Sequence, residues 1–261
     1  MQRPWRTPAA DRDIVAAVVR GFGILGAFTP QDTWLGNAEL AARTGLPKAT
    51  VSRFARTLTL LGYLHFSARR RQYRLAPPVL SLGYATAADF DIRHIARPLM
   101  QRLADRLDVL VALGTRDALD IVHVESCNSA HSIVSLRLEP GTRGRIAETA
   151  FGRALLAALP LTELDATMAA LEARYGPRWP EIHRAVKQAM SDITQRGFCT
   201  IVGSWRPDIN AVGVPLRLVP GQPILSLGLA GFAGQLTRRR CQQHIGPELV
   251  ALAREIESRA A

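Results

Sequence analysis

Three residues that could bind a metal follow one another at regular intervals: His123, Cys127 and His131 are each four positions apart. On a helix this spacing would place three zinc ligands along one side. The β-branched residues around His123 predict a strand instead, on which that geometry is lost. We therefore assign no metal site, and metal binding by these three residues stays open as an alternative.

No other group of residues makes a catalytic set. Asp105 with Asp108 falls at a predicted helix end, and Asp117 with Asp120 falls in a predicted turn, where aspartate is common. Cys199 has no histidine near it in the sequence that could activate a thiol. The chain also lacks a phosphate-binding loop and a dinucleotide fingerprint. We expect no catalytic residues, no cofactor and no enzymatic activity.

Positive charge is the feature that suggests a partner. The 261-residue chain has a formal net charge of +11 and a pI near 10.8. Residues 1–80 contain 12 Lys and Arg against 4 Asp and Glu, so less than a third of the length holds most of the excess. This asymmetry predicts a segment that binds a polyanion, joined to a nearly neutral domain.

Several cations of the first segment lie on a predicted helix-turn-helix. Apolar spacing (Val15, Val18, Phe22 and Leu25) predicts an amphipathic helix over about 13–28, and a second helix over 37–44 stops at Gly45. After Gly45-Leu46-Pro47 a third helix begins, and its apolar stripe is formed by Val51, Phe54, Leu58 and Leu61. A short helix, a tight turn with glycine and a longer helix are typical of this motif.

Burial of that stripe leaves a polar face that suits DNA. Small and hydroxyl-bearing residues in the first turn allow close approach to base edges and phosphates, and arginines can bind a phosphate or a guanine. From this helix we predict DNA contacts by Lys48, Ala49, Thr50, Ser52, Arg53 and Arg56.

Two short strand-like runs follow, at 63–66 and 72–75, and predict a β-hairpin. Its tip, Arg69-Arg70-Arg71, would lie along the phosphate backbone as the wing of a winged helix. We predict that residues 1–75 form a DNA-binding winged helix.

The rest of the chain predicts an α+β domain. Strands are expected at 109–113, 119–124, 133–138, 198–202, 211–216 and 224–229, the first two joined by a turn at 114–117. Helices are expected at about 91–106, 149–158, 161–174, 180–196 and 237–258. Strands gathered with flanking helices indicate an antiparallel sheet. Without an apolar run of about 18–20 residues or an export signal, we expect a cytoplasmic protein that does not contact a membrane.

Two groups of motifs extend along the chain. The first comprises residues 38–53 (AELAARTGLPKATVSR), 57–63 (TLTLLGY) and 73–77 (YRLAP), and the second 141–157 (GTRGRIAETAFGRALLA), Gly197-Phe198, 210–216 (NAVGVPL) and 228–232 (GLAGF). In order and spacing, over about residues 13–258, they resemble the IclR-type transcriptional regulators. The resemblance implies a winged helix-turn-helix at 1–76, a linker helix at 77–90, and a GAF-like α/β sandwich with an antiparallel sheet at 91–261, which binds an effector.

The resemblance also implies an effector pocket. Carried over by position, it would involve Leu136, Leu138, Thr149, Ala150, Phe151, Trp205, Asn210, Ala211, Ser226 and Gly228. Phe151 and Trp205 are bulky where family members that bind small carboxylates tend to have more polar or small groups. We therefore expect an effector with an apolar or aromatic body and one acidic group, held by backbone N–H groups and an arginine. The alternative is that these aromatics are plain core.

We predict a sequence-specific regulator that binds double-stranded operator DNA under the control of a small organic effector. It would dimerise through the first helix and the linker, and pair into a dimer of dimers through the effector domains. One alternative is a ligand-binding enzyme with an appended nucleic-acid domain, which would show turnover without operator binding. Another is an architectural DNA binder, which would bind operator and scrambled DNA alike.

Overall fold

The computed structural model describes residues 13–29, 32–88, 92–130, 136, 138–204, 206–218 and 223–260. The chain divides into two units, residues 1–89 and 90–261. A helix, α4 (Pro78–Ala88), occupies the segment expected to be a linker, and its role as a linker stays a prediction. No helix in the described ranges is long and apolar enough to cross a lipid bilayer.

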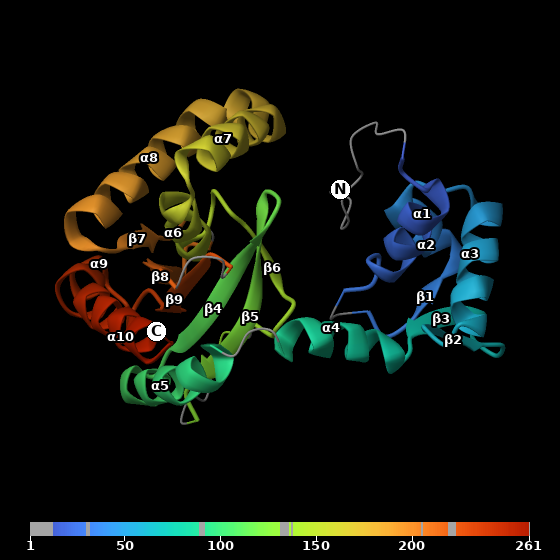
Figure 1. Cartoon of the computed structure of the whole chain (residues 1–261), viewed down its shortest axis with the longest axis horizontal. Helices are drawn as coiled ribbons and strands as arrows, with labels where there is room; N and C mark the ends of the chain where they lie inside the picture. Colours follow the sequence, from blue (N-terminus) through green and yellow to red (C-terminus); the bar gives the residue numbers. More distant parts are fainter. Residues whose placement is uncertain are drawn as a thin grey trace. The chain divides into compact units, whose positions relative to one another are not determined.

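The first unit contains the predicted helix-turn-helix and hairpin (Figure 1). Its helices are α1 (Ala16–Leu25), α2 (Asn37–Thr44) and α3 (Lys48–Leu60). The hairpin strands are β2 (Leu64–Ser67) and β3 (Gln72–Leu75). A short strand, β1 (Leu35–Gly36), pairs with β3, so the sheet has the order β1-β3-β2. Because β1 has only two residues, it carries no periodicity from which it could have been predicted.

The core of this unit differs in part from the predicted one. Val15, Val18 and Phe22, expected as the apolar face of the first helix, are 61 %, 55 % and 61 % exposed. Leu61 is exposed as well, and the buried residues of α3 are Val51, Ala55 and Leu58. The cause on α1 is that both of its sides are apolar, so spacing alone does not determine which one packs. The buried cluster consists of Ile24, Ala27, Leu35, Leu40, Val51, Ala55, Leu58 and Leu64.

The second unit is built on a six-stranded sheet in which each strand pairs antiparallel with its neighbours, in the order β6-β5-β4-β9-β8-β7. The strands are β4 (Leu110–Asp117), β5 (Asp120–Asn128), β6 (Arg143–Arg145), β7 (Cys199–Val202), β8 (Ile209–Leu216) and β9 (Leu225–Phe232). This confirms an α+β fold with an antiparallel sheet.

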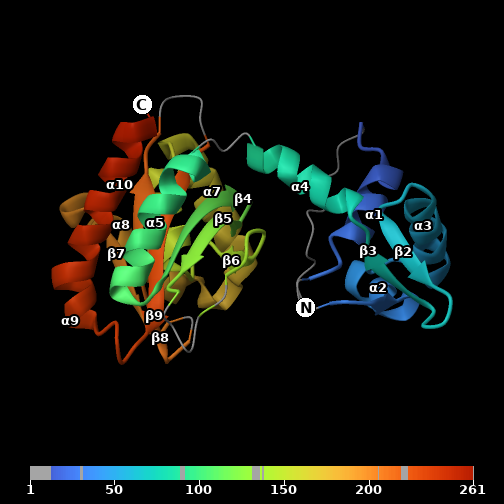
Figure 2. The same cartoon turned by 90° about the horizontal axis from the view of Figure 1, so that it is seen from below.

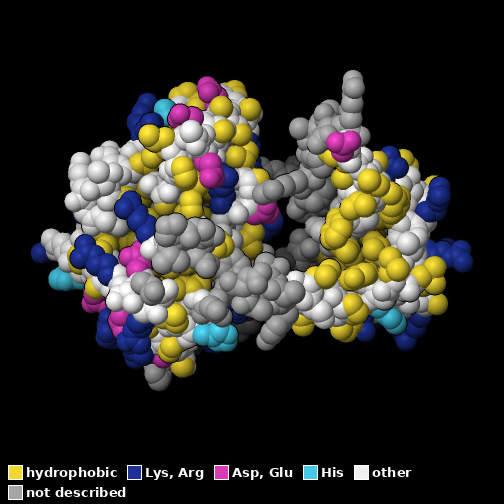
Figure 3. All heavy atoms as spheres, viewed as in Figure 1, with side chains coloured by type: hydrophobic (Ala, Val, Ile, Leu, Met, Phe, Trp, Pro, Cys, Tyr) yellow, Lys and Arg dark blue, Asp and Glu magenta, His cyan; other side chains and the backbone are white. Residues whose placement is uncertain are grey.

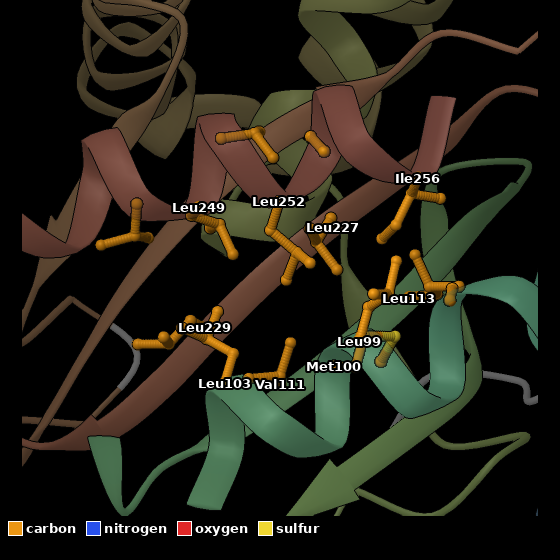
Figure 4. Close-up of a cluster of buried hydrophobic side chains, with 14 of the residues drawn as sticks. Leu99, Met100, Leu103, Val111, Leu113, Leu227, Leu229, Leu249, Leu252 and Ile256 are labelled. Atoms are coloured by element: carbon orange, nitrogen blue, oxygen red, sulfur yellow. The ribbon is translucent and has the colours of Figure 1, made fainter. Parts of the chain in front are cut away.

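Helices cover both faces of this sheet (Figure 2). On one face, α5 (Ile92–Leu107) and α10 (Gly246–Ala260) bury leucines such as Leu103 and Leu252 against β4 and β9 (Figure 4). On the other face lies α6 (Ala150–Ala158), which contacts α8 (Trp179–Arg196). Further elements are α7 (Leu161–Tyr175), the 3-10 turn Gly176–Arg178, α9 (Arg238–Arg240) and a π-helical turn (Cys241–Ile245).

Several predicted boundaries in this unit are wrong. Residues 114–117, expected as a turn, continue β4, because β5 and β9 extend its hydrogen-bonded ladder. The final helix, expected over 237–258, is interrupted by the π-helical turn. Strand β6 was not predicted, since its sequence, Arg-Gly-Arg, has no apolar alternation. Of the strand expected at 133–138, residues 133–135 and 137 lie outside the described residues, and Leu136 and Leu138 are not in a strand.

Two glycines allow the start of α6 to lie close to the sheet. A Cβ on Gly213 of β8 would be 2.2 Å from the carbonyl oxygen of Ala150, and one on Gly228 of β9 would be 2.3 Å from the ring of Phe151. These two glycines face each other in the β8–β9 pair. The sheet therefore has no side chains at the point where α6 begins.

We predict that Gly213→Ala lowers the free energy of unfolding by about 2 kcal/mol or more, because the new methyl group meets backbone that cannot move aside cheaply. The matched control is Gly234→Ala, where a Cβ has no neighbour within 4 Å and the cost should be small. Denaturant unfolding monitored by circular dichroism measures both. Equal stabilities of the two variants would contradict this account of the α6 contact.

Candidate functional site

The polar face of α3 is exposed. Lys48, Ala49, Ser52, Arg53 and Arg56 are exposed, and Thr50 is half-buried. Within the described ranges, no acidic side chain pairs with the three cations on this face. Unpaired cations beside small residues can bind phosphates or base edges without first breaking an ion pair.

Contacts within the turn hold α3 in place. Gly45 adopts φ +68°, and its N–H donates to the Ala41 carbonyl at 2.8 Å, which ends α2. The Asn37 side chain donates to the Lys48 carbonyl at 3.1 Å and so joins the start of α2 to the start of α3. A left-handed turn of this kind favours glycine because it has no Cβ.

An ion pair fastens α2 to the segment that follows α1. Arg43 donates to Asp32 through Nη2 at 2.8 Å and to the Ala27 carbonyl at 2.9 Å. The hydrogen bond from Arg43 holds the pKa of the Asp32 carboxyl well below its usual range. This arginine is therefore engaged in the fold and is not available to DNA.

The tip of the hairpin carries the predicted cluster Arg69-Arg70-Arg71, and all three side chains are exposed. Two arginines of the wing lie over Trp34, the guanidinium of Arg70 at 5.6 Å and that of Arg74 at 5.1 Å from the ring centroid. Cation–π contacts of this kind restrict where the guanidinium groups point. Trp34 and Arg74 were not predicted, because only the pairing of β1 with β3 brings them together.

The second unit contains a cavity of about 570 Å³, including space open to solvent, beside the first turn of α6. Five predicted pocket residues line it: Leu138, Thr149, Ala150, Phe151 and Ala211. Seven lining residues were not predicted: His123, Arg143, Gly144, Glu148, Ile201, Ile209 and Ala230. The wall is mostly apolar, with its charged groups contributed by Arg143 and Glu148.

The other predicted pocket residues lie elsewhere. Asn210 is buried, and its amide donates to the Leu236 carbonyl at 2.7 Å while its oxygen accepts from the Gly203 N–H at 3.0 Å. Ser226 is fully buried in β9, and Gly228 lies beneath the Phe151 ring. Leu136 lines a separate hollow with Asp108 and Phe232, and Trp205 falls outside the described residues.

The start of α6 faces the cavity. Thr149 caps this helix, accepting from the Gly152 N–H at 3.1 Å and donating to the Arg145 carbonyl at 3.1 Å. The N–H groups of Ala150 and Phe151 have no carbonyl partner inside the helix, as is general for a first turn. A helix start next to an apolar cavity favours an anionic group on a bound ligand.

Both charged groups of the lining have ion-pair partners. Arg143 pairs with Asp117 and, at 3.5 Å, with Asp120. Glu148 pairs with Arg145 at 3.0 Å and with Arg178 at 3.7 Å. These pairs connect the cavity to β4, β5 and the 3-10 turn before α8.

His123 lines the cavity and lies beside a β-bulge in β5. In the β4–β5 pair, Leu113 lies opposite Glu125 and Gly114 opposite His123, so Val124 is the extra residue. The ring of His123 contacts Phe151 edge-on at 5.0 Å on the α6 face, whereas Cys127 belongs to the core on the α5 face. A bulge reverses the alternation of a strand in this way.

This arrangement separates two of the three residues considered for metal binding, and the third, His131, falls outside the described residues. Among the residues that the structure describes, no three His, Cys, Asp or Glu side chains form a metal-binding group. Burial raises the pKa of the Cys199 thiol to about 12, so it is not a thiolate nucleophile at neutral pH.

His123 is 3 % exposed, and its Nδ1 is enclosed without a hydrogen-bond partner among the residues that the structure describes. Burial lowers the pKa of its imidazole to about 4, so the ring is neutral at pH 7. A buried polar group without a partner costs roughly 1–3 kcal/mol of stability. The sequence singles out His123 only as a possible metal ligand, and its position beside the cavity could not be predicted because that position depends on the pairing between strands.

The buried imidazole predicts a pH dependence of stability. With a pKa of about 4 folded and roughly 6.5 unfolded, the unfolded state binds more protons between these values, so stability falls as pH falls through that window. Between pH 7 and 4.5 we expect His123 to account for a loss of about 2 kcal/mol. In denaturant unfolding, His123→Phe should lack this loss, and an equal loss in both proteins would contradict it.

Comparison with known proteins agrees with this geometry. The family description "Bacterial transcriptional regulator IclR C-terminal" matches residues 84–258, and "IclR helix-turn-helix domain" matches residues 17–68. The HTH-type transcriptional regulator TsaQ1/TsaQ2 of Comamonas testosteroni is 31 % identical over 247 residues, covering 94 % of this chain and 88 % of that protein.

Two solved structures have the same fold. An IclR family transcriptional regulator from Brucella abortus is 35 % identical with a TM-score of 0.86, covering 100 % of this chain and 99 % of that chain. An IclR homologue from Microbacterium hydrocarbonoxydans, solved with 4-hydroxybenzoate, is 21 % identical with a TM-score of 0.72, covering 94 % and 100 %.

A winged helix with an exposed basic face, joined in one chain to an antiparallel sheet with a helix-capped cavity, defines an effector-responsive DNA-binding regulator. The chain belongs to the IclR family of bacterial transcriptional regulators.

Proposed function

We propose that this regulator reads its operator with α3, holds the phosphate backbone with its wing, and responds to an aromatic or otherwise apolar acid bound in the cavity beside α6. It acts in the cytoplasm, where the chromosome lies, and has no catalytic activity of its own. The observation that carries the proposal is the exposed, unpaired cationic face of α3 on a helix whose opposite side is buried.

The two basic regions are suited to different tasks. Thr50 and Arg53 stand near the start of α3, where a recognition helix reaches base edges in the major groove. Arg69, Arg70 and Arg71 stand on a hairpin tip, where contacts reach phosphates and carry no sequence information.

We predict that Arg53→Ala weakens operator binding by about 5- to 150-fold and relaxes the sequence preference, since one base contact carries about 1–3 kcal/mol. Replacing Arg69, Arg70 and Arg71 with alanine should weaken operator and scrambled DNA alike, and should lower the slope of log K against log salt by about 2–3. Fluorescence anisotropy at several salt concentrations measures both effects.

The matched control is Arg254→Ala, which removes an exposed cation from α10 in the second unit and should change neither quantity. If Arg53→Ala weakened operator and scrambled DNA equally, α3 would not be the element that reads sequence.

The exposed side of α1 suits a dimer contact. Val15, Val18 and Phe22 share one side of this helix, and hydrophobic side chains gather on the face of the first unit seen in Figure 3. Leu80 and Leu82 of α4 are also exposed. Apolar stripes of this kind in a water-soluble unit mark protein contacts, and two copies of one stripe make a two-fold interface.

We predict that the double substitution Val18→Ser and Phe22→Ser raises the dimer dissociation constant at least tenfold, because it removes apolar area from the contact. Sedimentation equilibrium measures this. Leu161→Ser is the control, since Leu161 at the start of α7 is also an exposed apolar residue and its replacement should leave the mass unchanged. A wild-type protein that stays monomeric at micromolar concentration would rule out this role of α1.

The cavity suits a ligand with an apolar body and one acidic end. Its wall includes Phe151, Ile201 and Ile209, and the α6 N-terminus supplies partial positive charge. Arg143 also lines the cavity, with its guanidinium paired to Asp117 and Asp120. The related structure from Microbacterium hydrocarbonoxydans was solved with an acid of this kind, 4-hydroxybenzoate.

We predict that benzoate-sized aromatic acids raise the melting temperature of the purified protein by a few degrees, since binding to the folded state stabilises it. Short aliphatic acids such as acetate or pyruvate should leave it unchanged, because they bury too little apolar surface. Differential scanning fluorimetry at fixed pH and ionic strength is sufficient. A response to the short acids alone would exclude the proposed effector class.

A further inference from the structure

We propose that His123 is the residue by which the cavity recognises a hydroxyl group on its effector, so that the ligand is a hydroxylated aromatic or hydroxylated apolar acid. The inference rests on the proposed function, in that the cavity beside α6 holds the effector.

The first support is the incomplete hydrogen bonding of the ring. His123 lines the cavity and is almost fully buried, and no side-chain hydrogen bond engages its imidazole in the described part of the chain. Nδ1 in particular is enclosed without a partner in the described ranges. Buried polar groups nearly always have partners, so a ring that has none beside a cavity is one that a ligand can satisfy.

The second support is the type of group that fits. A neutral imidazole has one N–H donor and one acceptor nitrogen. A hydroxyl matches either nitrogen, because it both donates and accepts. A carboxylate matches only the donor and would place a charge against the apolar wall of Phe151 and Ile209, whereas the α6 N-terminus offers it a better place.

The third support is the bulge itself. In a strand with regular alternation, His123 and Glu125, which are two residues apart, would lie on the same face, and the Glu125 carboxylate could accept a hydrogen bond from the imidazole. The bulge turns Glu125 to the α5 face, where Arg93 and Arg97 bind it. The imidazole of His123 is thereby left without a hydrogen-bond partner in the described part of the chain.

The test compares each of the three hydroxybenzoates with benzoate by isothermal titration calorimetry, using the full-length protein and His123→Phe. We expect at least one hydroxybenzoate to bind the wild type about tenfold more tightly than benzoate does, and His123→Phe to bind both within about twofold. His183→Phe, which replaces a histidine stacked on Trp179 in α8, should keep the wild-type preference.

A second measurement separates a hydroxyl from a carboxylate at His123. Titrations at pH 7 in two buffers of different ionisation enthalpy should show no proton uptake, because the imidazole stays neutral. Benzoate binding without a hydroxyl preference, a preference that survives His123→Phe, or uptake of about one proton would each overturn the inference and leave the proposed function intact. If neither benzoate nor any hydroxybenzoate bound, both the inference about His123 and the proposed effector class would fail.

From a different observation we infer that the Glu125 carboxylate couples ligand binding in the cavity to the position of the first turn of α5. Glu125 is 3 % exposed and accepts from Arg93 Nη2 at 3.0 Å and Nε at 3.2 Å, from Arg97 Nη1 at 2.7 Å, and from the Ser126 N–H at 3.0 Å. Arg93 is the second residue of α5, which follows α4 along the chain. One ion cluster thus fastens the first turn of α5 to a strand position two residues from His123.

Glu125→Gln keeps the shape of the side chain and removes its charge. We expect it to bind the tightest hydroxybenzoate within twofold of the wild type, while the fold-change that this ligand produces in operator affinity falls toward one. By linkage, the effect of operator on ligand affinity must fall by the same factor. Arg97→Gln, which removes one of the two arginine contacts from a half-exposed position, should reduce the fold-change in the same direction.

Glu248→Gln is the control, because it breaks the exposed ion pair between Glu248 of α10 and Arg106 of α5 and should leave the fold-change as in the wild type. An unchanged fold-change in both Glu125→Gln and Arg97→Gln would overturn the inference, and so would a loss of ligand affinity equal to the loss of coupling. If no ligand changed operator affinity in the wild type, the proposed function itself would fail.

Discussion

The burial of one side of α3 determines where its cations point. Val51 and Ala55 are fully buried against α1 and α2, and Leu58 nearly so. Rotating the helix to bring Arg53 inward would expose these side chains and bury a guanidinium without a partner, and both changes are unfavourable. The exposed cationic surface of α3 is therefore a consequence of core packing and needs no additional contact to hold it.

Packing also determines the site in the second unit, where two glycines of the sheet leave space for the start of α6. Gly213 and Gly228 let α6 start directly on the sheet, and the bulge at Val124 turns two neighbouring polar residues to opposite faces. His123 consequently meets the cavity, while Glu125 meets the arginines of α5. The bulge in β5 thus directs His123 to the α6 face of the sheet and Glu125 to the α5 face.

The sequence was informative where structure is local. The turn at Gly45, the length of α3 and the hairpin after it follow from spacing and from residues with strong conformational preferences, and the structure has them. Which face of α1 packs was not predictable, because Ile24 and Phe22 are equally apolar and only tertiary contacts select between them. Strand β1 and the continuation of β4 past Gly114 also depend on pairing with distant strands.

In the cavity, too, some lining residues could be predicted from the sequence and others could not. Thr149 and Phe151 could be placed there through the motif that starts α6, whereas His123 and Arg143 could not, because strand register and not sequence distance brings them to it.

Selection of bound sequences from a random pool of duplex DNA shows whether α3 reads DNA. If it does, the full-length protein enriches one sequence with two-fold symmetry, its half-sites separated by about one helical turn or a multiple of it. A protein with Thr50→Ala and Arg53→Ala then enriches that sequence far less. A pool that stays random with the wild-type protein, or an identical enriched sequence with the variant, would contradict the claim that α3 reads DNA.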